Sequence, residues 1–254
     1  MHELRYTLRK VFSLEADTAT HEEIKQRIVS GGQVTGTNMC ILICAILIAS
    51  VGLNVGSTAV IIGAMLVSPL MGSILAMAYG VASAHKSQFL KNFYGFILQL
   101  LISILVSTVY FLLSPINEPT SELLARTQPS FYDVIIATAG GFAGIIGSTR
   151  SDKANNVIPG VAIATALMPP VCTCGYSIAH GQWEMLSGAS YLFIVNCYFI
   201  FLSAVLILDV LKIPKVRTIT EQQWKNLKKA IIRNTIIVLI PSIFFTFMML
   251  KDKH

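Results

Sequence analysis

The stretches IIGAMLVSPLMGS at residues 61–73 and VAIATALMPPVCT at residues 161–173 decide how this chain folds. Each is a run of small and apolar residues with proline near its middle, at Pro69 and at Pro169-Pro170. Neither stretch alternates apolar with polar residues, so the pattern indicates helix and not strand. Both lie in apolar runs long enough to cross a bilayer core of about 30 Å. The sequence therefore predicts membrane-spanning helices that contain proline.

The composition also indicates that lipid surrounds most of the chain. Of the 254 residues, 54% are hydrophobic and 13% are charged, whereas a soluble domain carries about 25% charged residues. This excludes a soluble enzyme, a disordered chain and a nucleic-acid-binding module as the main interpretation. Apolar runs also contain every cysteine, which predicts buried free thiols and no disulfide framework; the cysteines are Cys40, Cys44, Cys172, Cys174 and Cys197.

The hydropathy pattern predicts an all-α, polytopic membrane helix bundle of about seven spans. The second run is 27 residues long, about 40 Å as one helix. It exceeds the bilayer core, so it must tilt, kink or break. The candidate spans are 38–54, 58–84, 92–113, 131–148, 157–179, 190–211 and 234–250.

Positive charge sets the expected orientation. With the N-terminus in the cytoplasm, sixteen of the 19 Lys and Arg residues fall on the cytoplasmic side, and the others are Arg126, Lys251 and Lys253. Since Lys and Arg concentrate in cytoplasmic loops, the sequence predicts a cytoplasmic N-terminus.

Three segments follow from this pattern. Residues 1–34 form a short cytoplasmic amphipathic segment, whose helix starts at Thr20 with Glu23 three residues on. Residues 35–211 form a six-span core, and residues 212–254 hold a basic interfacial helix and the last span. The basic helix is either a topology anchor or a site for anionic lipid headgroups, through Lys225, Lys228, Lys229 and Arg233.

The core contains an internal repeat. Gly56-Ser57-Thr58 follows the first span and Gly147-Ser148-Thr149 follows the fourth, and the next span in each case contains proline. Because each unit has three crossings, the second unit enters the membrane in the opposite orientation. The expected architecture is a 3+3 inverted repeat, 35–113 and 131–211, with a proline-broken second helix in each repeat and one extra span. Many secondary transporters have this architecture.

Proline removes a backbone donor and disfavours the helical conformation of the residue before it. Carbonyl groups near 64–66 and 165–166 are then expected to lose their partners at membrane depth, where lipid offers none. Two facing breaks would form a midplane site for a small solute. Two kinked packing helices remain the alternative, because proline is common in membrane spans.

The residues expected to line this site carry hydroxyl, amide or accessible backbone groups. No Asp, Glu, Lys, Arg or His lies in the middle of a span, which favours a neutral or anionic solute over proton-coupled chemistry. Gln99 and Asn196 fit interhelical hydrogen bonding better than a ligand site. The candidate ligand-binding residues are Asn54, Ser57, Thr58, Gly63, Ser68, Pro69, Gly72, Ser73, Thr165, Pro169, Pro170 and Thr173.

These patterns predict a transporter or channel for a small solute. The alternative is a non-transporting oligomeric scaffold or lipid-binding membrane protein. An enzyme is not expected, because no nucleophile and base converge, and neither a cofactor nor a metal ion is expected. Membrane lipid and further copies of the chain are the expected partners, the latter because Gly52-x-x-x-Gly56 and Gly140-x-x-x-Gly144 allow close helix packing.

The stretches NVGSTAVIIGAMLVSPLMGS at 54–73 and PGVAIATALMPPV at 159–171 resemble a bacterial membrane family, the "uncharacterised hydrophobic domain" family, or domain of unknown function 389. The resemblance covers about residues 35–210. It implies a bacterial inner-membrane protein, but it supplies no activity and no ligand list. The motifs typical of the family fall on Gly63, Pro69, Gly72, Ala164, Pro169 and Pro170.

Overall fold

The computed structural model describes residues 18–151, 157–216 and 229–243, with only the backbone described in 157–165. This part of the chain is helical, as the sequence predicts. The named helices are α2 (His21–Gly31), α3 (Gly36–Asn54), α4 (Thr58–Val67), α5 (Leu70–Ala82), α6 (Lys86–Leu113), α7 (Ser121–Leu124), α8 (Phe131–Thr149), α9 (Val157–Ala179) and α10 (Trp183–Val210).

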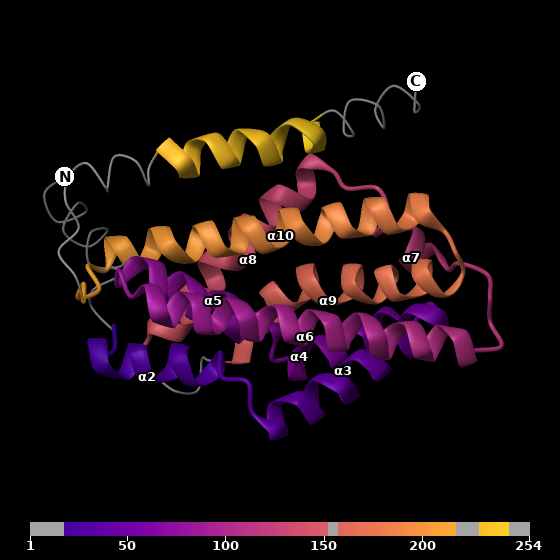
Figure 1. Ribbon diagram of the computed structural model, residues 1–254, viewed down its shortest axis with the longest axis horizontal. Helices are drawn as coiled ribbons and strands as arrows, with labels where there is room; N and C mark the ends of the chain where they lie inside the picture. The colour runs from indigo at the N-terminus through magenta and orange to yellow at the C-terminus, as the bar shows by residue number, and fades with distance from the viewer. Residues whose placement is uncertain (1–17, 152–156, 217–228, 244–254) are drawn as a thin grey trace, which may run out of the picture.

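The helices α6, α9 and α10 run along the long axis of the molecule (Figure 1). Within the first half, α3, α4, α5 and α6 are linked by contacts, and in the second half α8, α9 and α10 all contact one another. The halves meet where α9 packs on α3, α4, α5 and α6, and where α10 packs on α5. Helix α9 is therefore the central element of the bundle.

The expected break in the second span is confirmed. Helix α4 ends at Val67, Ser68 is extended at φ −73° and ψ 127°, and α5 starts after Pro69. The two helices are bent by 47°. Pro69 has no N–H for the Met65 carbonyl, and that carbonyl instead accepts a 3.3 Å hydrogen bond from Ser68 N.

The expected break in the fifth span is wrong, because α9 continues from Val157 to Ala179 with Pro169 and Pro170 inside it. Pro170 removes the donor that would normally serve the Ala166 carbonyl, four residues back. The side chain of Asn196 in α10 replaces it, since Nδ2 donates to Ala166 O at 2.7 Å. An amide from a neighbouring helix thus satisfies the carbonyl, and the helix stays intact.

Hydroxyl groups join α3, α6 and α9 in the interior. Ser50 Oγ donates to Ser107 Oγ at 3.1 Å, and Ser107 Oγ donates to the Cys172 carbonyl at 3.0 Å. All three residues are buried. Gly175 allows this approach, because a Cβ atom there would lie 2.5 Å from Ser107 Oγ.

The cysteines only partly match their prediction. All five are free, and Cys172 and Cys174 are buried. Cys40 and Cys44 are exposed instead, because they lie on the face of α3 that no other described helix covers.

Among the described residues, α3, α6, α8 and α10 are long and apolar enough to cross a membrane, and the bent pair α4–α5 adds a fifth span if it counts as one. Helix α9, whose side chains are described from Ala166 onward, is not among them. These apolar helices support the prediction of a membrane protein. Seven spans and an inverted repeat stay predictions.

A further helical stretch, 229–243, lies along α10 (Figure 1). Tyr198 and Tyr191 of α10 hold it, because their hydroxyl groups donate to the carbonyls of Ile231 at 3.0 Å and Val238 at 2.6 Å. Of the expected headgroup ligands, Lys229 and Arg233 are exposed on this stretch, whereas Lys225 and Lys228 lie outside the described residues.

We expect Asn196→Ala to destabilise the protein by about 1 to 3 kcal/mol, because it leaves a buried carbonyl without a donor. Pro170→Ala restores a backbone donor to that carbonyl. In the Pro170→Ala background, the cost of Asn196→Ala should therefore fall by about 1 kcal/mol or more. Equilibrium unfolding in mixed detergent micelles measures this cycle. Asn54→Ala is the control, and an equal cost of Asn196→Ala in both backgrounds would contradict the compensation.

Candidate functional site

A pocket of about 270 Å³ lies between α4, α7, α8, α9 and α10. It brings together Thr58 at the start of α4 and Pro170 in α9, two of the residues that the sequence singles out. Its polar lining residues are Thr58, Glu122, Arg126, Asp133 and Asn196, and the others are apolar. Besides Pro170, the apolar lining residues are Ile61, Ile62, Met65, Ile136, Ala166 and Leu192.

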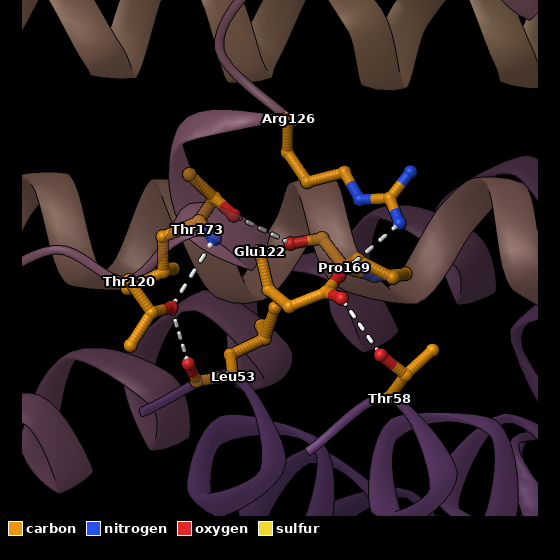
Figure 2. A network of polar contacts seen from close by, with 8 residues as sticks. Leu53, Thr58, Thr120, Glu122, Arg126, Pro169 and Thr173 are labelled. Atoms are coloured by element: carbon orange, nitrogen blue, oxygen red, sulfur yellow. Dashed lines mark hydrogen bonds and ion pairs between the residues drawn. The ribbon is translucent and has the colours of Figure 1, made fainter. Parts of the chain in front are cut away.

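The polar end is a small network around Glu122 (Figure 2). The Thr58 hydroxyl donates to Glu122 Oε1 at 2.7 Å. The Arg126 guanidinium lies one helical turn further and forms an ion pair with Glu122 Oε2 at 3.8 Å. The Arg126 Nε atom is buried and has no hydrogen-bond partner within the described residues. One guanidinium donor is thus left over at this end of the pocket.

Helix α7 has only four residues, and its N-cap residue, Thr120, positions it. Thr120 accepts a hydrogen bond from Leu123 N at 3.4 Å and donates to the Leu53 carbonyl at 2.6 Å (Figure 2). The second bond ties α7 to the end of α3. The Leu53 carbonyl also accepts a 3.3 Å hydrogen bond from Gly56 N, so Thr120 adds a second donor there. This contact holds α7, and with it Glu122, near the start of α4.

The inner end of the pocket is formed by Asn196. This residue follows the start of α10 at Trp183 by thirteen positions, about 20 Å along the helix. Its side chain is 3% exposed, and its Oδ1 has no partner within the described residues. The nitrogen Nδ2 must face the Ala166 carbonyl, because only the nitrogen of the amide can donate to it. The other atom of the amide, which points away from Ala166, is therefore the acceptor Oδ1.

Arg126 and Asn196 thus each bring to the pocket lining a side chain with one buried polar atom that has no partner within the described residues. Between them the walls are aliphatic. Polar groups that are buried without partners are costly, so both atoms favour a guest that can pair with them. A guest with a hydrogen-bond donor at one end and an acceptor or a negative charge at the other matches this arrangement.

Several predicted site residues lie near the pocket but make other contacts. Ser57 is the residue before α4 and its side chain makes no cap hydrogen bond. Asn54 is buried, and its Nδ2 donates to Ser114 Oγ at 2.5 Å and to Tyr110 Oη at 3.3 Å. Gly63 faces outward, with nothing within 4 Å of an added Cβ atom. None of these three residues lines the pocket.

The predicted residues around the break pack inside the first half. Ser68 Oγ accepts a 3.4 Å hydrogen bond from Leu70 N at the start of α5. Ser73 Oγ donates to Gln99 Oε1 at 2.8 Å and so joins α5 to α6, as expected of an interhelical Gln99. Pro69 is half-buried at the bend. The two proline sites therefore do not face one another across one cavity.

Gly72 is a packing residue between α5 and α2. A Cβ atom on Gly72 would lie 1.9 Å from the Gly31 carbonyl oxygen at the end of α2. Helix α2 begins with the capping box that Thr20 and Glu23 predict, and it buries Ile24 and Ile28. The N-terminal segment thus packs on the core at this glycine.

In α9, Thr173 donates to the Pro169 carbonyl at 2.9 Å, which satisfies its hydroxyl within its own helix. Pro169 is buried, and the Thr165 side chain lies outside the described residues. Sequence reasoning missed Glu122, Arg126 and Asp133 as site residues; they lie in α7, just after it and in the first turn of α8. The available signal was the Glu122–Arg126 spacing of four residues, typical of an ion pair on a helix.

In the described part of the chain, no group of three or more His, Cys, Asp and Glu residues is placed to hold a metal ion. The two carboxylates of the pocket, Glu122 and Asp133, already pair with nearby protein groups. Asp133 Oδ2 accepts hydrogen bonds from Ser130 N at 2.7 Å and Ser130 Oγ at 2.8 Å, which caps α8.

Comparison with known proteins finds one family. The family model described as "Domain of unknown function (DUF389)" matches residues 65–202. An uncharacterized protein of Methanocaldococcus jannaschii is 28% identical over 203 residues, which cover 80% of this chain and 63% of the relative. The chain thus spans less than two thirds of the length of that relative. No solved structure matches.

The two glycines of the family-like motif are expected to respond oppositely to alanine. Gly72→Ala should destabilise the protein by about 1 to 3 kcal/mol, because the new methyl group meets backbone. Gly63→Ala meets open space, and it should be neutral or stabilise α4 by up to about 1 kcal/mol. Thermal unfolding in detergent measures both, and hydrogen exchange in α2 should rise only in Gly72→Ala. Unchanged stability and exchange in that variant would refute the packing role.

Proposed function

Because the chain belongs to the DUF389 family, a family without an assigned activity, we propose its function from its own pocket: it is a transporter or channel for a small neutral or anionic solute. The observation that carries the proposal is a pair of buried polar atoms, Arg126 Nε and Asn196 Oδ1, which have no hydrogen-bond partner within the described residues and belong to two side chains that line one pocket. Pro170 of α9 lines the same pocket.

The chemistry of the two ends narrows the solute. Asn196 Oδ1 accepts hydrogen bonds, so it favours a hydroxyl or amide N–H group. Arg126 favours a carbonyl, hydroxyl or carboxylate oxygen. Glu122 already balances the charge of Arg126, which argues against a multiply charged anion. Small polyols, amides and hydroxy acids combine these features and suit a volume of about 270 Å³.

We further propose that the chain crosses a bacterial inner membrane seven times, as a 3+3 inverted repeat with one extra span and a cytoplasmic N-terminus. The contacts of α4 with α9 and of α5 with α10 support this proposal, because each joins a helix of the first repeat to a helix of the second. In this topology, the pocket mouth at Glu122 and Arg126 opens on the outer side. Lys86 and Arg150 mark the cytoplasmic side.

The alternative is an oligomeric scaffold that binds lipid and transports nothing. It has support in the exposed basic residues Lys229 and Arg233. The scaffold function gives no role to Arg126 Nε and Asn196 Oδ1, the two buried polar atoms of the pocket lining that have no partner within the described residues. A measurement of solute flux separates the two functions.

Flux is tested with the full chain in proteoliposomes, by osmotic swelling in glycerol, urea and sodium lactate. Ile136 lines the pocket, whereas its neighbour Ile135 does not, and their exposed fractions are 54% and 51%. We expect Ile136→Trp to abolish protein-dependent swelling, because the indole fills the pocket. Ile135→Trp is the matched control and should swell like the parent.

Arg126→Gln should change the preference among the probes, because lactate loses its charged partner while glycerol retains a hydrogen-bond donor. If the parent admits none of the three probes, or if Ile136→Trp and Ile135→Trp swell alike, the pocket is not the solute path and the scaffold function is favoured.

The topology makes a separate prediction. In a chain whose five native cysteines are replaced by alanine, Gln128→Cys should react with a membrane-impermeant maleimide on intact cells. Ser87→Cys should react only after the cells are opened, because it lies at the cytoplasmic start of α6. The reverse pattern would invert the proposed orientation, and labelling of both in intact cells would exclude it.

A further inference from the structure

A second cavity system lies on another side of the bundle, away from the solute pocket. Helices α6 and α10 flank an apolar groove of about 450 Å³ with α5 and α9 beneath it. Aromatic side chains supply much of its lining, among them Phe89, Phe93 and Phe96 of α6 and Phe193 and Phe201 of α10. The Phe96 and Phe193 rings stack with centroids 6.1 Å apart.

The groove opens sideways. Ile194 and Phe93 line it and are 55% and 40% exposed, so they form a rim that faces hydrocarbon in a membrane. Along α6 the lining runs from Phe89 to Ile104, about 22 Å. One leaflet of the hydrocarbon core is about 15 Å thick. A single extended acyl chain therefore fits the groove in length.

A polar cavity of about 540 Å³ lies at the start of α6. Lys86, Lys91, His85 and Ser87 line it. Lys86 precedes Phe89 by three residues and so lies on the helix face that carries the aromatic lining. The lining of the groove along α6 thus begins, at Phe89, three residues after Lys86 of the second cavity, at the end of α6 that the proposed topology places in the cytoplasm.

An apolar groove with two lysines near one end suits an amphiphile that has a negatively charged headgroup. We infer that the two cavities form a binding site for one anionic phospholipid of the cytoplasmic leaflet. Its acyl chain lies in the groove between α6 and α10, and its phosphate binds Lys86 and Lys91. The positive end of the α6 dipole adds to the attraction for the phosphate. The inference is independent of the solute pocket, with which the groove shares no lining residue.

Other occupants fit less well. A helix from a second copy has a diameter of about 10 Å with its side chains, which is wider than an acyl chain and leaves the lysine cavity unused. An empty groove would forfeit the dispersion contacts of its aromatic lining. A phospholipid accounts for both cavities and for the charge at one end only.

Native mass spectrometry of the full chain, released from nanodiscs of phosphatidylglycerol and phosphatidylethanolamine, tests the site. We expect the parent to retain phosphatidylglycerol in preference to phosphatidylethanolamine. The double substitution Lys86→Gln/Lys91→Gln should remove the preference, whereas Lys25→Gln, at an exposed lysine of α2 outside both cavities, should leave it intact. Ile97→Trp narrows the groove and should reduce retention, whereas Leu98→Trp, next to it but outside the groove, should not.

A phosphatidylglycerol with a photoreactive acyl chain gives a second measurement on the unsubstituted chain. It should label peptides of α6 and α10 that line the groove. Equal retention of the two lipids by the parent, labelling confined to other helices, or a crosslink of groove residues to a second copy or to residues 244–254 would each overturn the inference.

Discussion

The bundle depends on finding hydrogen-bond donors for the carbonyl groups that lie four residues before its prolines, because proline has no N–H to offer them. Lipid offers them no donor, so each must find one in protein. At Pro69 the chain meets the constraint locally, with a tighter turn from Ser68 to Met65 and a bend of 47°. At Pro170 it meets the constraint through tertiary structure, with the amide of Asn196 on the Ala166 carbonyl. One solution breaks a helix, and the other joins two helices.

The second solution links the fold to the candidate site. Asn196 uses its donor to keep α9 continuous and presents its acceptor near the inner end of the pocket. Helix α10 cannot rotate or slide without breaking that bond. At the mouth, Thr120 fixes α7 to α3 through the Leu53 carbonyl and so holds Glu122 and Arg126 in place. Side-chain hydrogen bonds to helix carbonyls, at Leu53 and at Ala166, therefore position residues on both sides of the pocket.

The sequence could predict what local chemistry decides. The residue before Pro69 is driven out of the helical region, so the break at Ser68 was predictable, as was the capping box at Thr20. The intact α9 was not, because its compensating donor lies 30 residues away at Asn196. A pairing with one particular carbonyl has no sequence signal. Arg126 was missed because α7 is too short to show a hydrophobic period, and Gly72 was misjudged because only the structure brings Gly31 against it.

Asn196 also gives a physical route from solute binding to helix geometry. A guest that donates to Oδ1 polarises the amide, which strengthens the hydrogen bond from Nδ2 to Ala166 O, since hydrogen bonds in chains reinforce one another. Binding then favours the continuous form of α9, and by linkage the continuous form binds the guest more tightly. A kink at Pro170 withdraws the carbonyl from Asn196 and weakens both interactions together. The proline thus makes the integrity of α9 depend on Asn196, the side chain that binds the solute in the proposed function.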